Sequence, residues 1–440
     1  MQSVTLSVEA QDVEVPESQL SGLARLIDDA MAQSPRVIAR NAQTAITEAN
    51  LVSVKSQRLP QLSASGQFLG AREKRGDFTT TTDATKIYYS VTLSQPVYHW
   101  GTIRRSIGSQ HLRGRLDAEG RVETYLNLVR DVRHNYLRWI VLARIASRES
   151  LRLSISRGNL ELARAQFEDG SLARAQLNQS ENDLQRREIE YATAQSKVSE
   201  VRRLLSRLTG VPEQDFPQVE DTIPLADLES QALIATSLLT SFVANELPDS
   251  RDIRQAVLEM EIRANDLSDS RMTLRPDLDF VTGVTQNEQS YSANVGSRFQ
   301  YESLYAGLRL NWRIFDGFRS RGAIQAAVNR LKQAETQVAT VKLALLDSAE
   351  AVGEQLKILS MTIALQEREL ASAEYRFNYT RDRVEDGDLA QSDLDVARVN
   401  LENQTISALS ARLDYWNKIT ELLALVEADP AIGLVPLHQS

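Results

Sequence analysis

Two long stretches of the chain carry apolar residues at the spacing of an amphipathic helix. No proline lies between Pro96 and Pro212 or between Pro276 and Pro430. An interior proline costs a helix about 3 kcal/mol, so long helices are expected in these stretches. Apolar residues recur there at steps of three to five, which is typical of a coiled-coil-like stripe. In the first stretch they are Leu126, Val129, Val132, Leu137, Ile140 and Val141.

Each stretch predicts a helical hairpin. The first helix of each pair should be roughly 100 Å long at about 1.5 Å per residue. Gly170 and Gly387 mark the turns, since glycine adopts the backbone angles that end a helix. The expected helices run from 101 to 167, from 172 to 208, from 318 to 384 and from 389 to 426.

Two pairs of strands are predicted, one before each hairpin. Apolar and polar residues alternate from Ile87 to Ser94 and from Leu304 to Trp312, which is a strand signal. Their partners are the less regular segments from Leu62 to Gly70 and from Leu278 to Thr285. The polar segments that join them, from Arg72 to Thr85 and from Gln286 to Gln300, are predicted to be long loops.

The strands and hairpins together form a unit that occurs twice. Leu93 and Leu310 are about 217 positions apart, as are Gly170 and Gly387, and a copied unit of this size indicates pseudo-symmetry. We expect an N-terminal extension (1–20), a first repeat (21–210), a linker (211–250), a second repeat (251–427) and a C-terminal tail (428–440). Each repeat contains a helix, two strands and the hairpin, with the strands at about 60–70, 86–98, 277–286 and 301–313.

Composition narrows the class of protein. A net charge of -9 and a pI near 5.3 argue against nucleic acid as a partner, since phosphate binding needs a basic surface. The chain has no cysteine, which excludes disulfides, thiolate metal sites and a catalytic cysteine. No apolar stretch approaches the roughly 20 residues of a transmembrane helix. The N-terminus lacks the pattern of a secretory signal, so the protein is either cytosolic or a mature chain whose signal was removed.

An active site is not predicted. No two of the four histidines have metal-ligand spacing, and no phosphate-binding loop, nucleophile elbow or paired-carboxylate site is visible. We therefore expect no catalytic residue, no cofactor and no metal. The histidines are His99, His111, His134 and His438.

The strands pose a physical problem that points to a membrane. Four strands cannot close a barrel, for which about 8 are needed, and open edges invite association. Strands of about 9–11 residues with one apolar face have the dimensions of transmembrane β-barrel strands. Aromatic residues near them fit an interfacial girdle, or alternatively pack at the junction of strand and helix. They include Tyr88, Tyr98, Trp100, Tyr305, Trp312 and Phe315.

The duplicated order of strands and hairpin resembles the TolC family of bacterial outer membrane factors. The resemblance covers about residues 20–427 and is carried by four kinds of landmark: the entries Arg58-Leu59-Pro60 and Leu274-Arg275-Pro276, the transition Leu93-Ser94-Gln95-Pro96-Val97-Tyr98, its counterpart Leu310-Asn311-Trp312-Arg313-Ile314-Phe315-Asp316-Gly317, and the turns at Gly170 and Gly387.

The resemblance implies a mainly α fold with a β-barrel part. Three chains would form a twelve-stranded barrel in the outer membrane, continued by a twelve-helix coiled-coil tunnel in the periplasm that is closed at its tip. Residues 212–250 and 428–440 would form an equatorial belt around the tunnel. The strand loops, with Thr80 and Ser292, would lie outside the cell. The implied partners are outer-membrane lipid, a periplasmic adaptor and an inner-membrane transporter of the ABC type.

The resemblance also assigns a gate to the second hairpin. Asp393 matches a family position where a ring of aspartates narrows the periplasmic entrance, whereas Val396 occupies the next ring position. Asp388 and Asp395 are further candidates, and crowded carboxylates there would bind cations. The alternative is a solvated acidic turn at a helix end. Four arginines near the turns are candidates for ion pairs that hold the gate closed: Arg164, Arg174, Arg381 and Arg383.

The hairpin tips bear on which export machine the chain serves. Many drug-efflux members of the family carry small apolar residues around the turn glycine, which contact the adaptor. The tips here are acidic: Glu168, Asp169, Gly170 and Ser171 in the first hairpin, and Glu385, Asp386, Gly387 and Asp388 in the second. We therefore favour type I protein secretion over multidrug efflux. A soluble coiled-coil scaffold with a small β cap is the alternative from another class.

Overall fold

The computed structural model describes residues 14–74, 81–225, 228–290 and 298–435. The chain forms two compact units, and each takes segments from both repeats. The strand unit comprises Thr44–Ala118 and Gln255–Ala339, and the helical unit comprises Met1–Gln43, Glu119–Arg254 and Thr340–Ser440. The compact units thus divide the chain differently from the duplication, and the proposed repeat boundaries stay a prediction.

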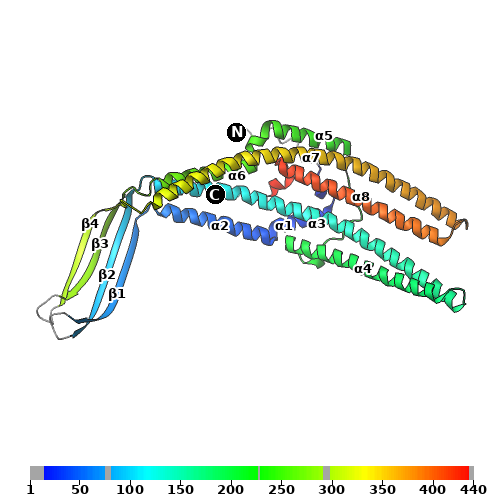
Figure 1. The fold of residues 1–440 in the computed structure, drawn as a ribbon, viewed down its shortest axis with the longest axis horizontal. Helices are drawn as coiled ribbons and strands as arrows, with labels where there is room; N and C mark the ends of the chain where they lie inside the picture. The colour runs from blue at the N-terminus through cyan, green and yellow to red at the C-terminus, as the bar shows by residue number, and fades with distance from the viewer. Residues whose placement is uncertain (1–13, 75–80, 226–227, 291–297, 436–440) are drawn as a thin grey trace. The chain divides into compact units, whose positions relative to one another are not determined.

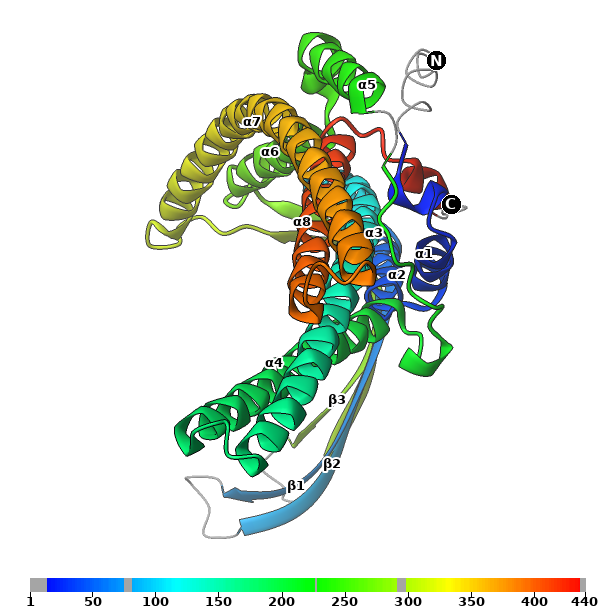
Figure 2. The same cartoon turned by 90° about the vertical axis from the view of Figure 1, so that its right-hand side faces the viewer.

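Both long hairpins predicted from the sequence are confirmed. Helices α3 (Thr102–Glu168) and α7 (Arg319–Glu385) each have 67 residues. Their return helices are α4 (Arg174–Thr209) and α8 (Gln391–Leu425). In both views α4 lies beside α3 and α8 beside α7 near the turns (Figures 1 and 2).

The helices that lead into the strands differ between the repeats. The first repeat has α1 (Ser21–Gln33) and α2 (Pro35–Ser56), and the second has the single helix α6 (Arg251–Ser270). The break follows from Pro35, because proline disfavours the helical conformation of the residue before it. Ser34 is accordingly extended, with ψ 133°.

A helix also lies in the linker, where none was predicted. Helix α5 (Leu228–Ser241) is followed by a π-helical turn, Phe242–Glu246. Short 3-10 turns occur at Pro16–Ser18, Glu213–Asp215, Leu247–Asp249 and Pro430–Leu434. The signal for α5 was the absence of proline and glycine from a leucine- and alanine-rich segment, which the acidic and proline-rich flanks obscured.

The four strands form one antiparallel sheet in the order β1-β2-β3-β4 (Figure 1). The strands are β1 (Gln61–Lys74), β2 (Thr81–Tyr98), β3 (Asp277–Ser290) and β4 (Arg298–Asn311). The two hairpins are therefore not separate, because β2 of the first repeat pairs with β3 of the second. Strands β1 and β4 form the two edges of this sheet.

The predicted long loops are wrong over most of their described residues. Strand β1 continues to Lys74 and β2 begins at Thr81, while β3 continues to Ser290 and β4 begins at Arg298. Polarity suggested a loop, but threonine is β-branched and fits a strand well. The Arg72 Nε atom also donates to Asp83 Oδ1 across the pair at 2.6 Å. Thr80, Ser292 and His438 lie outside the described residues.

The helical unit has its core around the middle of α3. Fully buried side chains there include Leu128, Val132 and Tyr136. Arg133 is buried among them with 1% exposure and binds two carboxylates. Its guanidinium donates to Asp429 Oδ2 at 2.6 Å and to Glu17 Oε2 at 2.9 Å. Burial lowers the pKa of Arg133, but Asp429 and Glu17 raise it more. The segments before α1 and after α8 are thereby attached to one helix.

Candidate functional site

The two hairpin turns have the same backbone geometry. Gly170 and Gly387 have φ of 76° and 82°, in the left-handed region that favours glycine. In the first turn Ser171 N donates to Gln166 O at 2.9 Å and Gly170 N to Phe167 O at 3.0 Å. In the second turn the corresponding hydrogen bonds run from Asp388 N to Arg383 O at 2.9 Å and from Gly387 N to Val384 O at 3.0 Å. This is the Schellman arrangement, which satisfies the last carbonyls of a helix and leaves the acidic turn side chains on the outside.

Asp393, the predicted gate residue, is exposed in the first turn of α8. Its Oδ2 atom accepts a hydrogen bond from the N–H of Ala390 at 3.1 Å. The residue at the same place in the first hairpin is Gln176, whose Oε1 atom accepts from Ala173 N at 3.2 Å. Both side chains therefore satisfy a donor at a helix N-terminus, as in half of a capping box. A carboxylate is also favoured there by the helix dipole, so Asp393 has a local structural role whatever else it does.

The four arginines proposed as gate ion pairs make contacts within their own hairpin. Arg383 Nε lies 3.1 Å from Asp388 Oδ2 across the second turn, and Arg381 lies 3.1 Å from its neighbour Asp382. Arg164 is 3.9 Å from Glu181, and the Arg174 guanidinium lies over the Phe167 ring at 5.5 Å. These side chains are largely exposed, and exposed ion pairs contribute at most about 1 kcal/mol each. Of the other candidates, Asp395 is half-buried and lies 3.5 Å from Gln391.

The two tips differ in how they pack. In the first hairpin Leu160, Ala163 and Leu177 form a buried cluster, against which Phe167, Leu172 and Leu184 pack. In the second hairpin Tyr375, Tyr379 and Val396 are exposed, at 72%, 52% and 61%. The first tip therefore has a small core of its own, whereas the second exposes aromatic and apolar side chains.

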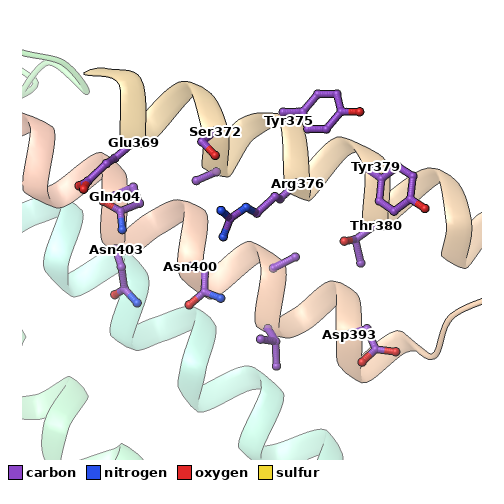
Figure 3. Close-up of a pocket in the computed structure, with 13 residues that line it drawn as sticks. Glu369, Ser372, Tyr375, Arg376, Tyr379, Thr380, Asp393, Asn400, Asn403 and Gln404 are labelled. Atoms are coloured by element: carbon purple, nitrogen blue, oxygen red, sulfur yellow. The ribbon is translucent and has the colours of Figure 1, made fainter. Parts of the chain in front are cut away.

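A groove of about 580 Å³ lies between α7 and α8 near the second tip (Figure 3). Asp393 and Val396 line it, so the face of α8 that carries the predicted gate position is the face that lines the groove. The other lining residues are mostly polar or aromatic: Glu369, Ser372, Ala373, Tyr375, Arg376, Tyr379, Thr380, Ala397, Asn400, Asn403 and Gln404. Arg376 was not predicted from the sequence, because an arginine in a long helix is ordinary there and only the packing of α8 against α7 places it in the groove.

Polar contacts between α3 and α8 join the second hairpin to the first, and they include His134 Nδ1 with Asn417 Oδ1 at 3.1 Å. Arg144 Nε lies 2.7 Å from Glu402 Oε2, and Arg148 Nη1 donates to Asn403 Oδ1 at 3.0 Å. Each joins α3 to α8. No sequence pattern predicts these contacts, because each pair is separated by more than 250 residues.

The apolar face of the sheet is continuous across all four strands. Residues that pair in an antiparallel register share a face, and Leu62 pairs with Leu93, Leu93 with Thr282, and Thr282 with Ala306. Large apolar side chains on this face are exposed, including Leu62, Phe68, Leu304 and Leu308 at 71%, 74%, 85% and 66%. The opposite face carries hydroxyl pairs, such as Ser65 with Ser90 at 2.8 Å.

The predicted aromatic girdle divides into two groups. Four of its residues lie where the strands meet the helices. There the Tyr98 and Trp100 rings are 5.0 Å apart, Trp100 Nε1 donates to Pro276 O at 2.8 Å, and Trp312 Nε1 donates to Leu274 O at 3.1 Å. Phe315 packs edge-on against Phe318 at 5.6 Å. Tyr88 and Tyr305 lie farther along the strands on the polar face, where Tyr305 OH is 3.0 Å from Thr92 Oγ1. This second group is not placed as an outward-facing girdle requires.

Within the described ranges of the chain, no group of three or more His, Cys, Asp or Glu residues is arranged to hold a metal ion. None of the helices in those ranges is both long and apolar enough to span a bilayer.

Comparison with solved structures identifies the fold. The outer membrane protein VceC of Vibrio cholerae matches with a TM-score of 0.64 and 17% identity, over 92% of this chain and 96% of that chain. The CmeC outer membrane channel of Campylobacter jejuni matches with a TM-score of 0.69 and 14% identity, over 92% and 86%. The open state of the MtrE outer membrane channel of Neisseria gonorrhoeae matches with a TM-score of 0.63 and 16% identity, over 92% and 88%.

A search of curated protein sequences finds no match. The description of the outer membrane efflux protein family, in contrast, matches residues 26–211 and 243–426, which together include both hairpins and all four strands. The chain therefore belongs to the outer membrane efflux protein family, whose members are channels of the outer membrane and not enzymes.

Proposed function

We propose that three copies of this chain form a duct that carries substrate across the periplasm and the outer membrane. The observation that carries the proposal is the apolar face of the sheet, which is aligned over four strands and exposed. Exposed patches of this kind mark a membrane or protein interface. Strands β1 and β4 each have an open edge in this sheet, and joining these edges between copies would close a barrel.

The oligomeric state tests this proposal directly. Channels of the family are trimers that work with an adaptor and an inner-membrane pump. Light scattering corrected for detergent should therefore give about three chains per particle. A stable monomer or dimer in detergent would contradict the architecture, because only three copies of the four-stranded sheet supply the strands of the proposed twelve-stranded barrel. Family membership argues against the alternative of a soluble coiled-coil scaffold.

We further propose that the duct serves a type I secretion system with an adaptor and an ABC-type transporter. The argument is the chemistry of the tips, where Asp169, Asp386 and Asp388 surround the turn glycines. All three side chains are exposed, and Asp388 pairs with Arg383. An adaptor that docks there would need polar or basic residues, because burying an unpaired carboxylate is costly.

Multidrug efflux is the second candidate function. It is favoured by the description of the matching family, the outer membrane efflux proteins. Deleting the coding sequence from the host should separate the two candidates. Type I secretion predicts that one or a few large proteins disappear from the medium while drug susceptibility is unchanged. A rise in susceptibility to several unrelated drugs with an unchanged set of secreted proteins would favour efflux.

We also propose that Asp393 narrows the entrance of the duct. Threefold symmetry would bring three copies of this carboxylate together, and its place on the lining of the groove supports a position facing the passage. A ring of carboxylates would favour cations through the local field. The tips from 168 to 171 and from 385 to 388 would contact the adaptor.

A further inference from the structure

The groove between α7 and α8 contains the cationic side chain of Arg376, which has no partner among the described residues. Arg376 lines the groove, and among the residues that the structure describes it has no ion pair and no hydrogen bond through its side chain. Figure 3 shows its guanidinium extending from α7 toward Asn400 of α8. Other arginines near the second hairpin do have partners: in α7, Arg383 pairs with Asp388 and Arg381 with Asp382, and Arg148 of α3 donates to Asn403.

The surroundings of Arg376 are rich in hydrogen-bond donors. Asn403 accepts a hydrogen bond from Arg148 through its Oδ1 atom. This leaves the NH₂ group of the Asn403 side chain available to donate into the groove. Asn400 and Thr380 line the same groove and each carries a donor. The carboxylates of the lining, Glu369 and Asp393, lie toward the two ends and leave the middle to Arg376 (Figure 3).

Two tyrosines of α7 also line the groove, and the Arg383 guanidinium lies 6.0 Å from the ring centroid of Tyr379. Tyr375 and Tyr379 follow along α7, line the groove and are 72% and 52% exposed. Exposed tyrosines offer a flat apolar body with a polar end, which suits contact with an aromatic ligand. A planar guanidinium with five donors recognises a carboxylate, phosphate or sulfonate in two-point contact.

We propose that this groove is a subsite that binds an anionic group attached to an aromatic body on its way into the duct. The inference rests on the proposed function, in which the face of α8 that carries Asp393 lines the passage. Counted from the turn glycine, Arg376 is five residues farther from the tip than Asp393, or about 7 Å along the hairpin. Cargo would thus meet acidic side chains first and a ring of three guanidinium groups immediately beyond them.

Binding of 1-naphthyl phosphate to the detergent-solubilised protein tests the subsite without requiring an open channel. Titration calorimetry should show binding to the unmodified protein that Arg376→Gln weakens at least tenfold and Arg376→Lys weakens less, since lysine keeps the charge but not the fork. Arg398→Gln is the matched control, because Arg398 is exposed on the same hairpin and is not among the residues that line the groove. Trimer elution and circular dichroism of each variant should be unchanged.

Measurements with further ligands separate the contribution of the anionic group to binding from that of the aromatic ring. Inorganic phosphate should bind more weakly than 1-naphthyl phosphate, and 1-naphthylamine should not compete. Tyr375→Ala with Tyr379→Ala should remove the advantage of the naphthyl group and leave phosphate binding unchanged. Absence of binding by the unmodified protein at millimolar ligand, or equal weakening by Arg376→Gln and Arg398→Gln, would overturn the subsite.

Ion selectivity in planar bilayers distinguishes this inference from the proposed function. Arg376→Gln should increase cation selectivity, whereas Asp393→Ala should decrease it. A chain that forms no conducting trimer refutes the proposed function, whatever it binds. A conducting trimer in which Arg376→Gln changes neither selectivity nor binding refutes the subsite alone.

Discussion

The two hairpins of this chain have the same length and the same turn but bury different surfaces. In the first hairpin Leu160 and Leu177 are 4% and 6% exposed and form a cluster at the tip. The matching residues of the second hairpin, Phe377 and Leu394, are only half-buried. The first hairpin thus forms a small core within itself, whereas the second leaves a polar and aromatic groove between its helices.

The long helices differ in the same way. Arg133 of α3 is buried and binds Glu17 and Asp429. Glu350, one repeat later in α7, is exposed. A duplicated unit first has two equal copies, and each position can then change according to what surrounds it. The comparison indicates that the two copies diverged, with these positions buried in the first hairpin and more exposed in the second.

The largest expected effect is at the buried arginine. Arg133→Met leaves Glu17 and Asp429 without their cation in a buried place, which should lower the free energy of unfolding by about 3–5 kcal/mol. Glu350→Gln, the matched change in the second repeat, should cost less than about 0.5 kcal/mol. Thermal unfolding of the detergent-solubilised variants measures both. Equal effects would show that the two long helices are not packed differently.

The next effect tests the two tips. Leu177→Ala removes a buried side chain from the first tip and should destabilise it by about 2–3 kcal/mol. Leu394→Ala should destabilise the second tip by less than half as much, because this side chain is only half-buried. Hydrogen exchange of the tip amides reports local opening. A greater loss of protection for Leu394→Ala would mean that the second tip is the better packed of the two.

A third pair of changes should affect both hairpins equally. Gly170→Ala and Gly387→Ala each place a Cβ atom at a left-handed φ, at a cost of about 1 kcal/mol. Nothing lies within 4 Å of a Cβ built at either glycine, so the cost is conformational and not steric. The midpoint of thermal unfolding should fall by the same amount in both variants. A clear difference would show that one of the turns is held by contacts outside its own hairpin.

The smallest expected effect on stability is at the N-termini of the two return helices, where the two matched changes should differ most in their effect on ion selectivity. Gln176→Ala and Asp393→Ala each remove one exposed hydrogen bond at a helix N-terminus, worth about 0.5 kcal/mol. Only Asp393→Ala should weaken cation selectivity and block by trivalent cations in planar bilayers. If Asp393→Ala leaves both unchanged while Asp395→Ala or Asp388→Ala alters them, the gate lies at one of those residues.

Much of the secondary structure could be predicted because its causes are local. Proline-free tracts and apolar periodicity located α3, α4, α7 and α8, and the turn glycines located their ends. Alternation located the centres of the strands and their apolar face. It failed at the distal strand ends, where cross-strand contacts such as Arg72 with Asp83 replace an apolar pattern.

The candidate site was predicted only in part. The acidic tips and Asp393 could be proposed from the sequence, because they lie at fixed distances from a turn glycine that the family resemblance makes recognisable, and their roles stay predictions. Arg376 was not found, because a helical arginine is ordinary in sequence. It gains meaning only from Asn400 and Asn403, which α8 brings to the same groove.

The sequence by itself determined the repeated elements, their turns and the amphipathic faces of the strands, since backbone preferences and periodicity act between near neighbours. The tertiary structure alone decided that β2 pairs with β3 in one sheet, that Arg133 joins Glu17 to Asp429, and that one hairpin has a core at its tip while the other has a groove. The physical reason is that burial and charge pairing depend on residues far apart in the chain, and two copies with the same local pattern acquire different neighbours when they fold.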